Sequence, residues 1–169
     1  MSRRAGWTVR PKGARDASAA TKLLAEVARE GSWLGTEWPF DVTAKSEWMR
    51  SGILDRRQIG WCVEDGAHMI ADLSVYEVDE PEPEIGIIVA GPYRGRGIGR
   101  ALIVTAIEWA ESNGRTALRL RVFPDNDSAI GLYRAVGFVD IERRSGTVPR
   151  KDGSLRDVLF MRRPIAERR

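Results

Sequence analysis

The spacing of apolar residues changes along the first third of the chain, and each change predicts a new element. Residues 7–10 (WTVR) have the composition of a strand, and from Asp16 to Arg29 the Ala, Leu and Val residues recur at helical spacing. Gly31 follows as the expected helix stop. After a loop that begins near Trp33, Thr43 is the expected N-cap of a second, short helix.

The middle of the chain predicts a hairpin, a third strand and a long helix. Two β-rich runs, QIGWCVE and AHMIADLSVYEV, meet at Asp65-Gly66, a dipeptide typical of tight hairpin turns. The acidic turn DEPEPE then leads to IGIIV, which we expect to be a third antiparallel strand. A helix from Gly97 to Ser112 follows, and Asn113-Gly114 ends it.

The last part of the chain predicts a strand (TALRLRVF), a short helix and a closing pair of strands. The short helix begins near Asp127 or Ser128 and ends before Gly137. GFVDIERRSGTV and LRDVLFMR then form the strand pair. Strand, helix and strand over residues 84–123 make a crossover, which sets two neighbouring strands parallel.

This order of elements predicts an α+β fold with α/β/α layers, in which a mixed sheet carries helices on both faces. We expect one domain over residues 1–169, with its core at about 7–164. The chain has 169 residues, 43% of them hydrophobic, which suffices for one packed core.

The charge balance argues against large polyanionic partners. The formal net charge is only +3, a mild basic bias that suits a small anionic ligand better than a nucleic acid. No apolar stretch reaches the roughly 18 residues of a membrane span, and MSRRAGWTVR has no hydrophobic signal core. We therefore expect a soluble cytoplasmic protein that binds neither nucleic acid nor membrane.

A single cysteine, Cys62, and a single histidine, His68, restrict the chemistry. They allow no internal disulfide and none of the usual zinc sites, so no metal is expected. Cys62 lies in the apolar run IGWCVE, which is typical of a buried thiol rather than of a nucleophile. His68 follows EDGA at the predicted hairpin, which disfavours a Ser-His-Asp hydrolase.

The loop RGRGIG, residues 94–99, joins the third strand to the long helix and favours a phosphate ligand. It is not a dinucleotide fingerprint, because Arg100 stands where the last glycine belongs, and it lacks the Lys-Ser/Thr pair of a P-loop. Its glycines let successive N–H groups face one point, and the following helix adds unpaired N–H groups. A pyrophosphate fits such a loop, although a tight turn with solvated arginines is the alternative.

Together with its neighbours, this loop resembles the GCN5-related N-acetyltransferase (GNAT) superfamily. RGRGIG fits the pattern Gln/Arg-x-x-Gly-x-Gly/Ala with which that family binds the pyrophosphate of acetyl-coenzyme A (acetyl-CoA). IIV stands just upstream, and NDSAIGLYRAVGF, residues 126–138, looks like the family's N-x-x-A-x-x-x-Y-x-x-x-G-F segment. The resemblance covers residues 84–140 strongly and the remainder by order of elements, and it implies a twisted, mainly antiparallel sheet.

The resemblance also implies roles for single residues. Ile87, Ile88 and Val89 would lie on a strand that splays from its parallel neighbour, often at a bulge. Its backbone would pair with the pantetheine amides, and one N–H would polarise the thioester carbonyl. Asn126 would hydrogen-bond the pantetheine arm, and Tyr133 would protonate the leaving thiolate, unless it only packs in the core. The pyrophosphate would be held by Arg94, Gly95, Arg96, Gly97, Ile98, Gly99 and Arg100.

A general base is needed because an alkyl ammonium must lose a proton before it can attack. Glu84 is our first choice, since GNATs similar to phosphinothricin and small amino-acid acetyltransferases have a glutamate at about this place. Acetyltransferases of ribosomal-protein N-termini have a catalytic glutamate at a position that resembles Arg121, and arginine cannot serve as that base. Alternatives to Glu84 are Glu77, Asp72 and Glu37.

The resemblance implies an acetyl-CoA-dependent N-acetyltransferase that uses acetyl-CoA as cosubstrate and acetylates a primary amine by direct attack in a ternary complex. A small molecule or amino acid is the favoured acceptor. A protein or peptide N-acetyltransferase and a non-catalytic coenzyme A sensor are the alternatives.

The acceptor's identity is open. Trp33, Trp38 and Trp48 are interpreted first as core or lid packing, and otherwise as an aromatic wall of the acceptor pocket. Acidic residues at strand ends could attract a polyamine, namely Glu77, Asp79, Glu80 and Glu82. The family often dimerises through its C-terminal strands, here residues 140–161, so a homodimer is also open.

Overall fold

The computed structural model describes residues 3–4 and 6–166, and one sheet runs through them. Its strand order is β1-β2-β3-β4-β5-β6-β8-β7. The strands are β1 (Arg3–Arg4), β2 (Trp7–Pro11), β3 (Gln58–Asp65), β4 (His68–Tyr76), β5 (Glu84–Val89), β6 (Ala117–Val122), β7 (Val139–Pro149) and β8 (Leu155–Pro164). The helices are α1 (Ala17–Ala28), α2 (Val42–Leu54), α3 (Ile98–Ser112) and α4 (Asp127–Ala135), with short 3₁₀ turns at Ala14–Asp16 and Gly91–Tyr93.

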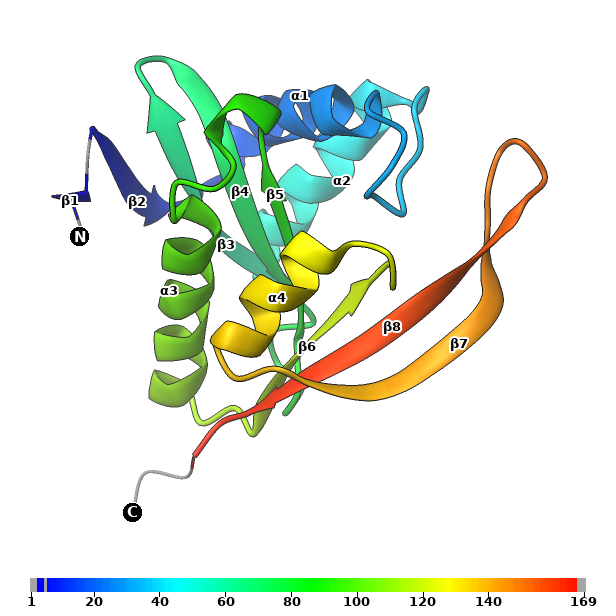
Figure 1. Ribbon diagram of the computed structural model, residues 1–169. Coiled ribbons are helices and arrows are strands. Elements are labelled where there is room, and N and C mark those ends of the chain that lie inside the picture. Colours follow the sequence, from blue (N-terminus) through cyan, green and yellow to red (C-terminus); the bar gives the residue numbers. More distant parts are fainter. Residues whose placement is uncertain (1–2, 5, 167–169) are drawn as a thin grey trace.

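Helices cover both faces of the sheet, which confirms the predicted α+β class. In Figure 1, α3 and α4 lie on one face and α1 and α2 on the other. Leu118, Leu120 and Val122 of β6 belong to the main core with the buried side of α3. Ile88 of β5 instead packs with Leu23 of α1, so alternate residues of the strands serve opposite faces.

Strands β5 and β6 are parallel neighbours that part almost at once. They share one bridge, Glu84 with Arg119, at which the Arg119 N–H donates to the Pro83 carbonyl at 3.0 Å. The rest of β5 pairs only with β4, without a register shift. The predicted splay is therefore confirmed, whereas the bulge that often accompanies it is not found in β5.

The C-terminal strands form a long hairpin that extends past the helices (Figure 1). β8 inserts between β6 and β7, and most of β7 is exposed. Val139, Ile141 and Leu155 are large apolar side chains on this hairpin that remain open to solvent.

Two local predictions were slightly wrong. Helix α2 begins two residues earlier than an N-cap at Thr43 implied, because the carboxylate of Asp41 caps it by accepting the Ala44 N–H at 2.8 Å. The β3–β4 turn is also shifted, since Asp65 pairs with His68. Within the described part of the chain, no helix is long and apolar enough to cross a membrane.

Candidate active site

The gap between β5 and β6 leaves two backbone amides of β5 without a strand partner. In an antiparallel pair, the N–H groups of alternate residues point toward the partner strand. The Ala90 N–H points toward β4, where it donates to the Ile70 carbonyl at 2.9 Å. The N–H groups of Ile87 and Val89 must then point the other way, into the gap that β6 has left.

The loop of residues 94–97 follows the 3₁₀ turn Gly91–Tyr93 at the end of β5 and leads into α3. Gly95 has φ +74° and Gly97 has φ +81°, a left-handed region that favours glycine. Gly97 is the N-cap of α3, whose first turn presents unpaired N–H groups and the positive end of the helix dipole. A Cβ at either glycine would meet no atom within 4 Å, so the conformation rather than crowding requires glycine.

Arg94 braces this loop. Its Nε donates to the Val89 carbonyl at 2.9 Å, and its two terminal nitrogens donate to the Glu30 carboxylate at 2.8 and 2.9 Å. The side chain is thus occupied, in contrast to the expectation that it would face a phosphate directly. Arg96 lies over the Tyr93 ring at 5.3 Å, and Arg100 is exposed on the first turn of α3.

Tyr133 projects from α4 into the main core on the α3/α4 face. Its ring packs against Phe138 with centroids 5.9 Å apart, and 7% of the residue is exposed. Burial raises the pKa of Tyr133 to about 12. At neutral pH the phenol therefore keeps its proton. Among the described residues its hydroxyl makes no hydrogen bond, so it is available to donate one to a ligand.

Glu84 and Arg121 form an ion pair where β5 and β6 begin to part. The Arg121 guanidinium donates to Glu84 Oε1 at 2.9 Å from Nε and 2.8 Å from a terminal nitrogen. Glu84 lies on the same face of β5 as Ile88, the α1/α2 face. The Glu84 carboxylate and the Tyr133 ring therefore lie on opposite faces of the sheet.

Comparison with known proteins agrees with this geometry. The family model described as "Acetyltransferase (GNAT) family" matches residues 17–138, which is most of the chain. The protein belongs to the GNAT family. The description of this family names acetyl transfer as its activity.

Individual GNAT relatives cover the chain to different extents. The [Ribosomal protein bS18]-alanine N-acetyltransferase of Escherichia coli strain K12 is 36% identical over 80 residues, 47% of this chain and 53% of that protein. An uncharacterised protein of Mycobacterium leprae is 42% identical over 83 residues, 48% of this chain and 21% of that protein. The chain thus spans only about a fifth of the length of this last relative.

Solved GNAT structures match nearly the whole chain. The protein yncA of Salmonella typhimurium, solved with its cofactor acetyl-CoA, superposes with a TM-score of 0.81 at 18% identity, over 97% of this chain and 96% of that one. The ribosomal-protein-S18-alanine N-acetyltransferase of Escherichia coli superposes with a TM-score of 0.75 at 25% identity, over 96% of each.

The described residues of this GNAT protein fit acetyl-CoA. The donor carries a pyrophosphate, a pantetheine arm with two amides and a thioester. The α3 N-terminus with Gly95 and Gly97 suits the anion, and the inward N–H groups of Ile87 and Val89 suit carbonyl acceptors.

Replacement of Gly97 by alanine tests the loop. A Cβ at φ +81° is strained by about 1–2 kcal/mol, so the loop must change its conformation. We expect Gly97→Ala to weaken coenzyme A binding about 5- to 30-fold in a calorimetric titration. Gly35→Ala is the matched control, because Gly35 has open space and an ordinary φ. Unchanged affinity in Gly97→Ala would argue against this loop as the anion site.

One of the two polar atoms of the Asn126 side chain is used to cap helix α4. Its Oδ1 accepts the Ala129 N–H at 3.2 Å as the N-cap of α4. Its Nδ2 makes no hydrogen bond among the described residues, so the expected contact with the pantetheine arm would have to come from this nitrogen.

The alternative bases are poorly placed. Asp72 is buried and paired with the Lys12 ammonium at 2.6 Å. Glu37 accepts the Lys151 N–H at 2.8 Å, far along the chain in the β7–β8 turn. Glu77 is exposed at the end of β4, with φ +54°. None of the three lies at the parting of β5 and β6, where Glu84 does.

Cys62 is buried, as the apolar run IGWCVE predicted. Its burial is complete and raises its pKa to about 11, which leaves the thiol protonated and unreactive. His68 is exposed at the start of β4. Residues 6–166 hold no cluster of three His, Cys, Asp or Glu side chains that could bind a metal ion.

The first interpretation of the three tryptophans was core or lid packing, and its core half is wrong. Trp33, Trp38 and Trp48 are 39%, 36% and 48% exposed, since they lie on the α1–α2 loop and on the outer side of α2. Trp38 packs under the Arg29 guanidinium at 4.0 Å, and Lys45 lies over Trp48 at 4.1 Å. Trp33 instead lines a pocket, which supports the aromatic-wall alternative for that residue alone.

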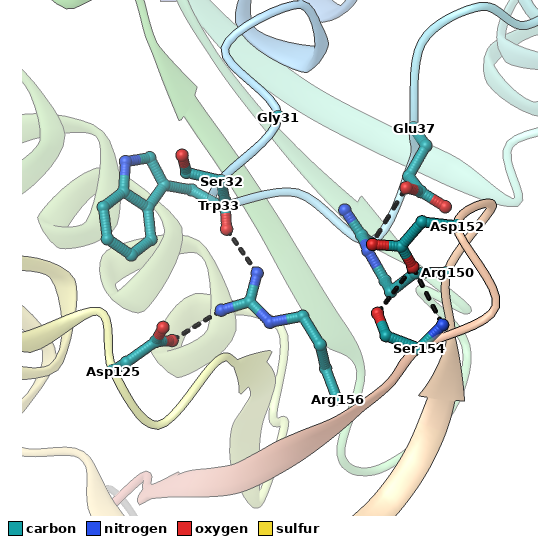
Figure 2. A pocket seen from close by; sticks show the side chains of 9 residues that line it. All are labelled: Gly31, Ser32, Trp33, Glu37, Asp125, Arg150, Asp152, Ser154 and Arg156. Carbon is teal, nitrogen blue, oxygen red and sulfur yellow. Dashed lines mark hydrogen bonds and ion pairs between the residues drawn. The ribbon is translucent and has the colours of Figure 1, made fainter.

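This pocket, of about 350 Å³, lies between the α1–α2 loop and the β7–β8 turn (Figure 2). Arg156 ties the two together, since it donates to the Ser32 carbonyl at 2.5 Å and to Asp125 at 2.6 Å. Arg150 donates to the Leu34 carbonyl at 3.0 Å. Sequence reasoning missed both arginines, because their partners on the α1–α2 loop, Ser32 and Leu34, lie more than a hundred residues away.

Proposed function

We propose that the protein transfers the acetyl group of acetyl-CoA to the primary amine of a small molecule, an amino acid being favoured. Transfer occurs by direct attack in a ternary complex. The observation that carries the proposal is the gap itself, into which the amides of Ile87 and Val89 point from β5. Glu84 lies on the α1/α2 face where the strands part, and Tyr133 lies in the core on the opposite face of the sheet.

Glu84 prepares the acceptor. An alkyl ammonium is protonated at neutral pH, so a carboxylate must accept one proton before the nitrogen lone pair can react. Glu84 lies where β5 and β6 begin to part, on the α1/α2 face, with 27% of its side chain exposed, and an acceptor can therefore reach it. Glu84 holds the proton taken from the acceptor ammonium and loses it to solvent after turnover.

The β5 amides and Tyr133 act on the other side of the reaction. Acetyl-CoA supplies an activated acetyl group as a thioester. The Ile87 or Val89 N–H stabilises the negative charge that develops on the carbonyl oxygen as the amine nitrogen bonds to carbon. Tyr133 gives its proton to the sulfur as the carbon–sulfur bond breaks, and solvent then restores the phenol.

The size of the acceptor side favours a small molecule. The pocket of about 350 Å³ is at the lower end of small-molecule sites. Arg150 pairs with Glu37 and Arg156 donates to the Ser32 carbonyl, and these contacts hold the α1–α2 loop against the β7–β8 turn (Figure 2). We expect this arrangement to restrict the path for an extended peptide.

A panel of amines tests the proposal. The full chain is incubated with acetyl-CoA and single amines, and thiol release is followed together with N-acetyl product. We expect turnover with at least one small amine and none without acceptor. Coenzyme A binding without turnover of any amine would favour the sensor alternative, which predicts a raised melting temperature and no product.

Tyr133→Phe separates general acid from core packing. Phenylalanine preserves the ring contact with Phe138 and removes a hydroxyl that has no partner among the described residues. We expect kcat to fall about a hundredfold, while KM for acetyl-CoA changes less than about twofold. Since the pKa of Tyr133 is raised to about 12, ionisation of this group causes no loss of wild-type kcat up to about pH 10. Unchanged kcat in Tyr133→Phe would refute the assignment.

A protein N-terminus is the second candidate acceptor. The 36% identity to the bS18-alanine N-acetyltransferase favours it. Arg121 weighs against it, because it stands at the position that resembles the catalytic glutamate of such enzymes. A peptide with a free N-terminal alanine in the amine panel decides between the two.

A further inference from the structure

Arg121 differs from the neighbouring Arg119 and Arg162 in its hydrogen-bond partner. Among the described residues, its guanidinium donates only to Glu84, and its side chain is 59% exposed. Arg119 donates to the Glu82 carbonyl at 2.8 Å, and Arg162 pairs with the Glu82 carboxylate at 2.6 Å. Arg119 and Arg162 thus both bind Glu82 and stabilise the turn before β5, whereas Arg121 binds only the carboxylate that we assign as the base.

The position of Arg121 faces the acceptor. In β6, Leu120 and Val122 point into the α3/α4 core, so Arg121 points to the opposite face, the one that carries Glu84. Phe123, two residues further on, lies under the Arg156 guanidinium at 3.7 Å and so reaches the edge of the pocket. The ion pair and that pocket therefore lie on the same face of the sheet, with the buried Phe123 between them.

We propose that Glu84 and Arg121 form a two-point site for an α-amino acid, in which Glu84 takes the ammonium and Arg121 the carboxylate. This inference rests on the proposed function and names its acceptor class. In the free protein the negative Glu84 and the positive Arg121 lie side by side. An amino acid carries the complementary groups, an ammonium and a carboxylate, on the same Cα atom. Arginine is suited to this role because its planar fork binds a carboxylate with two parallel hydrogen bonds.

The ion pair also links recognition of the acceptor's carboxylate to the release of Glu84 as a base. While Arg121 donates two hydrogen bonds to Glu84, that carboxylate oxygen is occupied and is withheld from an amine. An acceptor carboxylate offers Arg121 a new partner, and the exposed side chain can turn to it at low cost. Glu84 is then free to take one proton from the ammonium, and no other group has to change its charge.

The pocket beside Phe123 would receive the side chain of the amino acid. It is bordered by Trp33, Arg156 and Asp125, a mixture of aromatic and paired charged groups (Figure 2). Such a wall accepts a polar or aromatic side chain better than a long aliphatic one.

The test compares each amino acid with its own α-carboxamide, which keeps the amine and side chain but lacks the charge. For wild type we expect kcat/KM to favour the acid by about a hundredfold, the effect of two charge-assisted hydrogen bonds. Arg121→Gln should reduce this ratio to less than about fivefold, and Arg121→Lys should keep an intermediate ratio. Arg143→Gln is the matched control, because Arg143 is equally exposed in its pair with Asp157, and it should leave the ratio unchanged.

A binding measurement separates this inference from the proposed function. An amino acid should raise the melting temperature of the wild-type coenzyme A complex but not that of Arg121→Gln, and the carboxamide should raise neither. Equal turnover of acid and carboxamide by wild type, or an unchanged ratio in Arg121→Gln, would overturn the two-point site. Carboxylate-dependent binding without turnover would leave the site standing and refute the proposed function instead.

Discussion

Glu84→Gln is expected to lower kcat by about a hundredfold to ten-thousandfold at neutral pH, the usual contribution of a general base. The glutamine keeps the size of the side chain and can still accept a hydrogen bond from Arg121, so the fold around the gap should persist. Glu142→Gln is the matched control, because Glu142 forms an exposed pair with Arg144 at 2.9 Å on β7. It should leave kcat unchanged.

The pH dependence of Glu84→Gln distinguishes a base from a structural residue. The neutral fraction of an amine rises with pH, so an acceptor needs less help from a base in alkaline solution. The deficit of Glu84→Gln should therefore shrink as pH approaches the pKa of the acceptor amine. A deficit that stays constant from pH 7 to about pH 9.5 would contradict the assignment and indicate a structural or binding role.

Lys12→Met is expected to destabilise the protein by about 3–5 kcal/mol, the largest effect on stability that we predict. Lys12 and Asp72 are a buried pair with 1% and 5% of their side chains exposed, and the ammonium also donates to the Ser74 hydroxyl at 2.6 Å. Removal of the ammonium leaves the Asp72 carboxylate buried without its charge partner. Urea unfolding of the purified chain measures the loss.

Two further variants control this prediction. Lys12→Met with Asp72→Asn removes both charges and should recover most of the lost stability. Arg57→Met breaks a pair with Asp55 that is exposed on both sides and should cost less than about 1 kcal/mol. A small effect of Lys12→Met alone would mean that water or another group reaches Asp72.

Much of the fold could be predicted because its signals are local. Apolar periodicity gave the elements from β2 to β8, and the crossover over residues 84–123 predicted the parallel neighbours β5 and β6. The glycines at 95 and 97 identified a strand-to-helix loop, and both have the left-handed φ that only glycine adopts readily.

Interactions between distant segments could not be predicted. Lys12 reaches Asp72 only because Gly60 has no side chain between them; a Cβ there would lie 2.9 Å from Lys12 Cε. Asp72 and Ser74 give a weak signal, since they are the polar positions on one face of the otherwise apolar run MIADLSVY. No pattern in the sequence indicated the Lys12 end of this contact.

The same limit applies within the site. The motif predicted that Arg94 binds phosphate. In the structure the Arg94 guanidinium instead forms an ion pair at 2.8 Å with Glu30, just after α1. The pair of Glu84 with Arg121 could likewise be found only in the structure. Sequence motifs identify which residues surround the gap, and only the fold shows which of them are already occupied.

The most direct test of the account is the rate of N-acetyl product formation by the wild-type chain with acetyl-CoA and α-amino acids, each beside its carboxamide, in the presence and absence of the Tyr133→Phe and Glu84→Gln substitutions. We predict product from at least one amino acid, with the rate lowered about a hundredfold or more by either substitution while coenzyme A binding is retained. Thiol release without N-acetyl product, or a full rate in both variants, would contradict the proposal that this gap catalyses acetyl transfer to an amine.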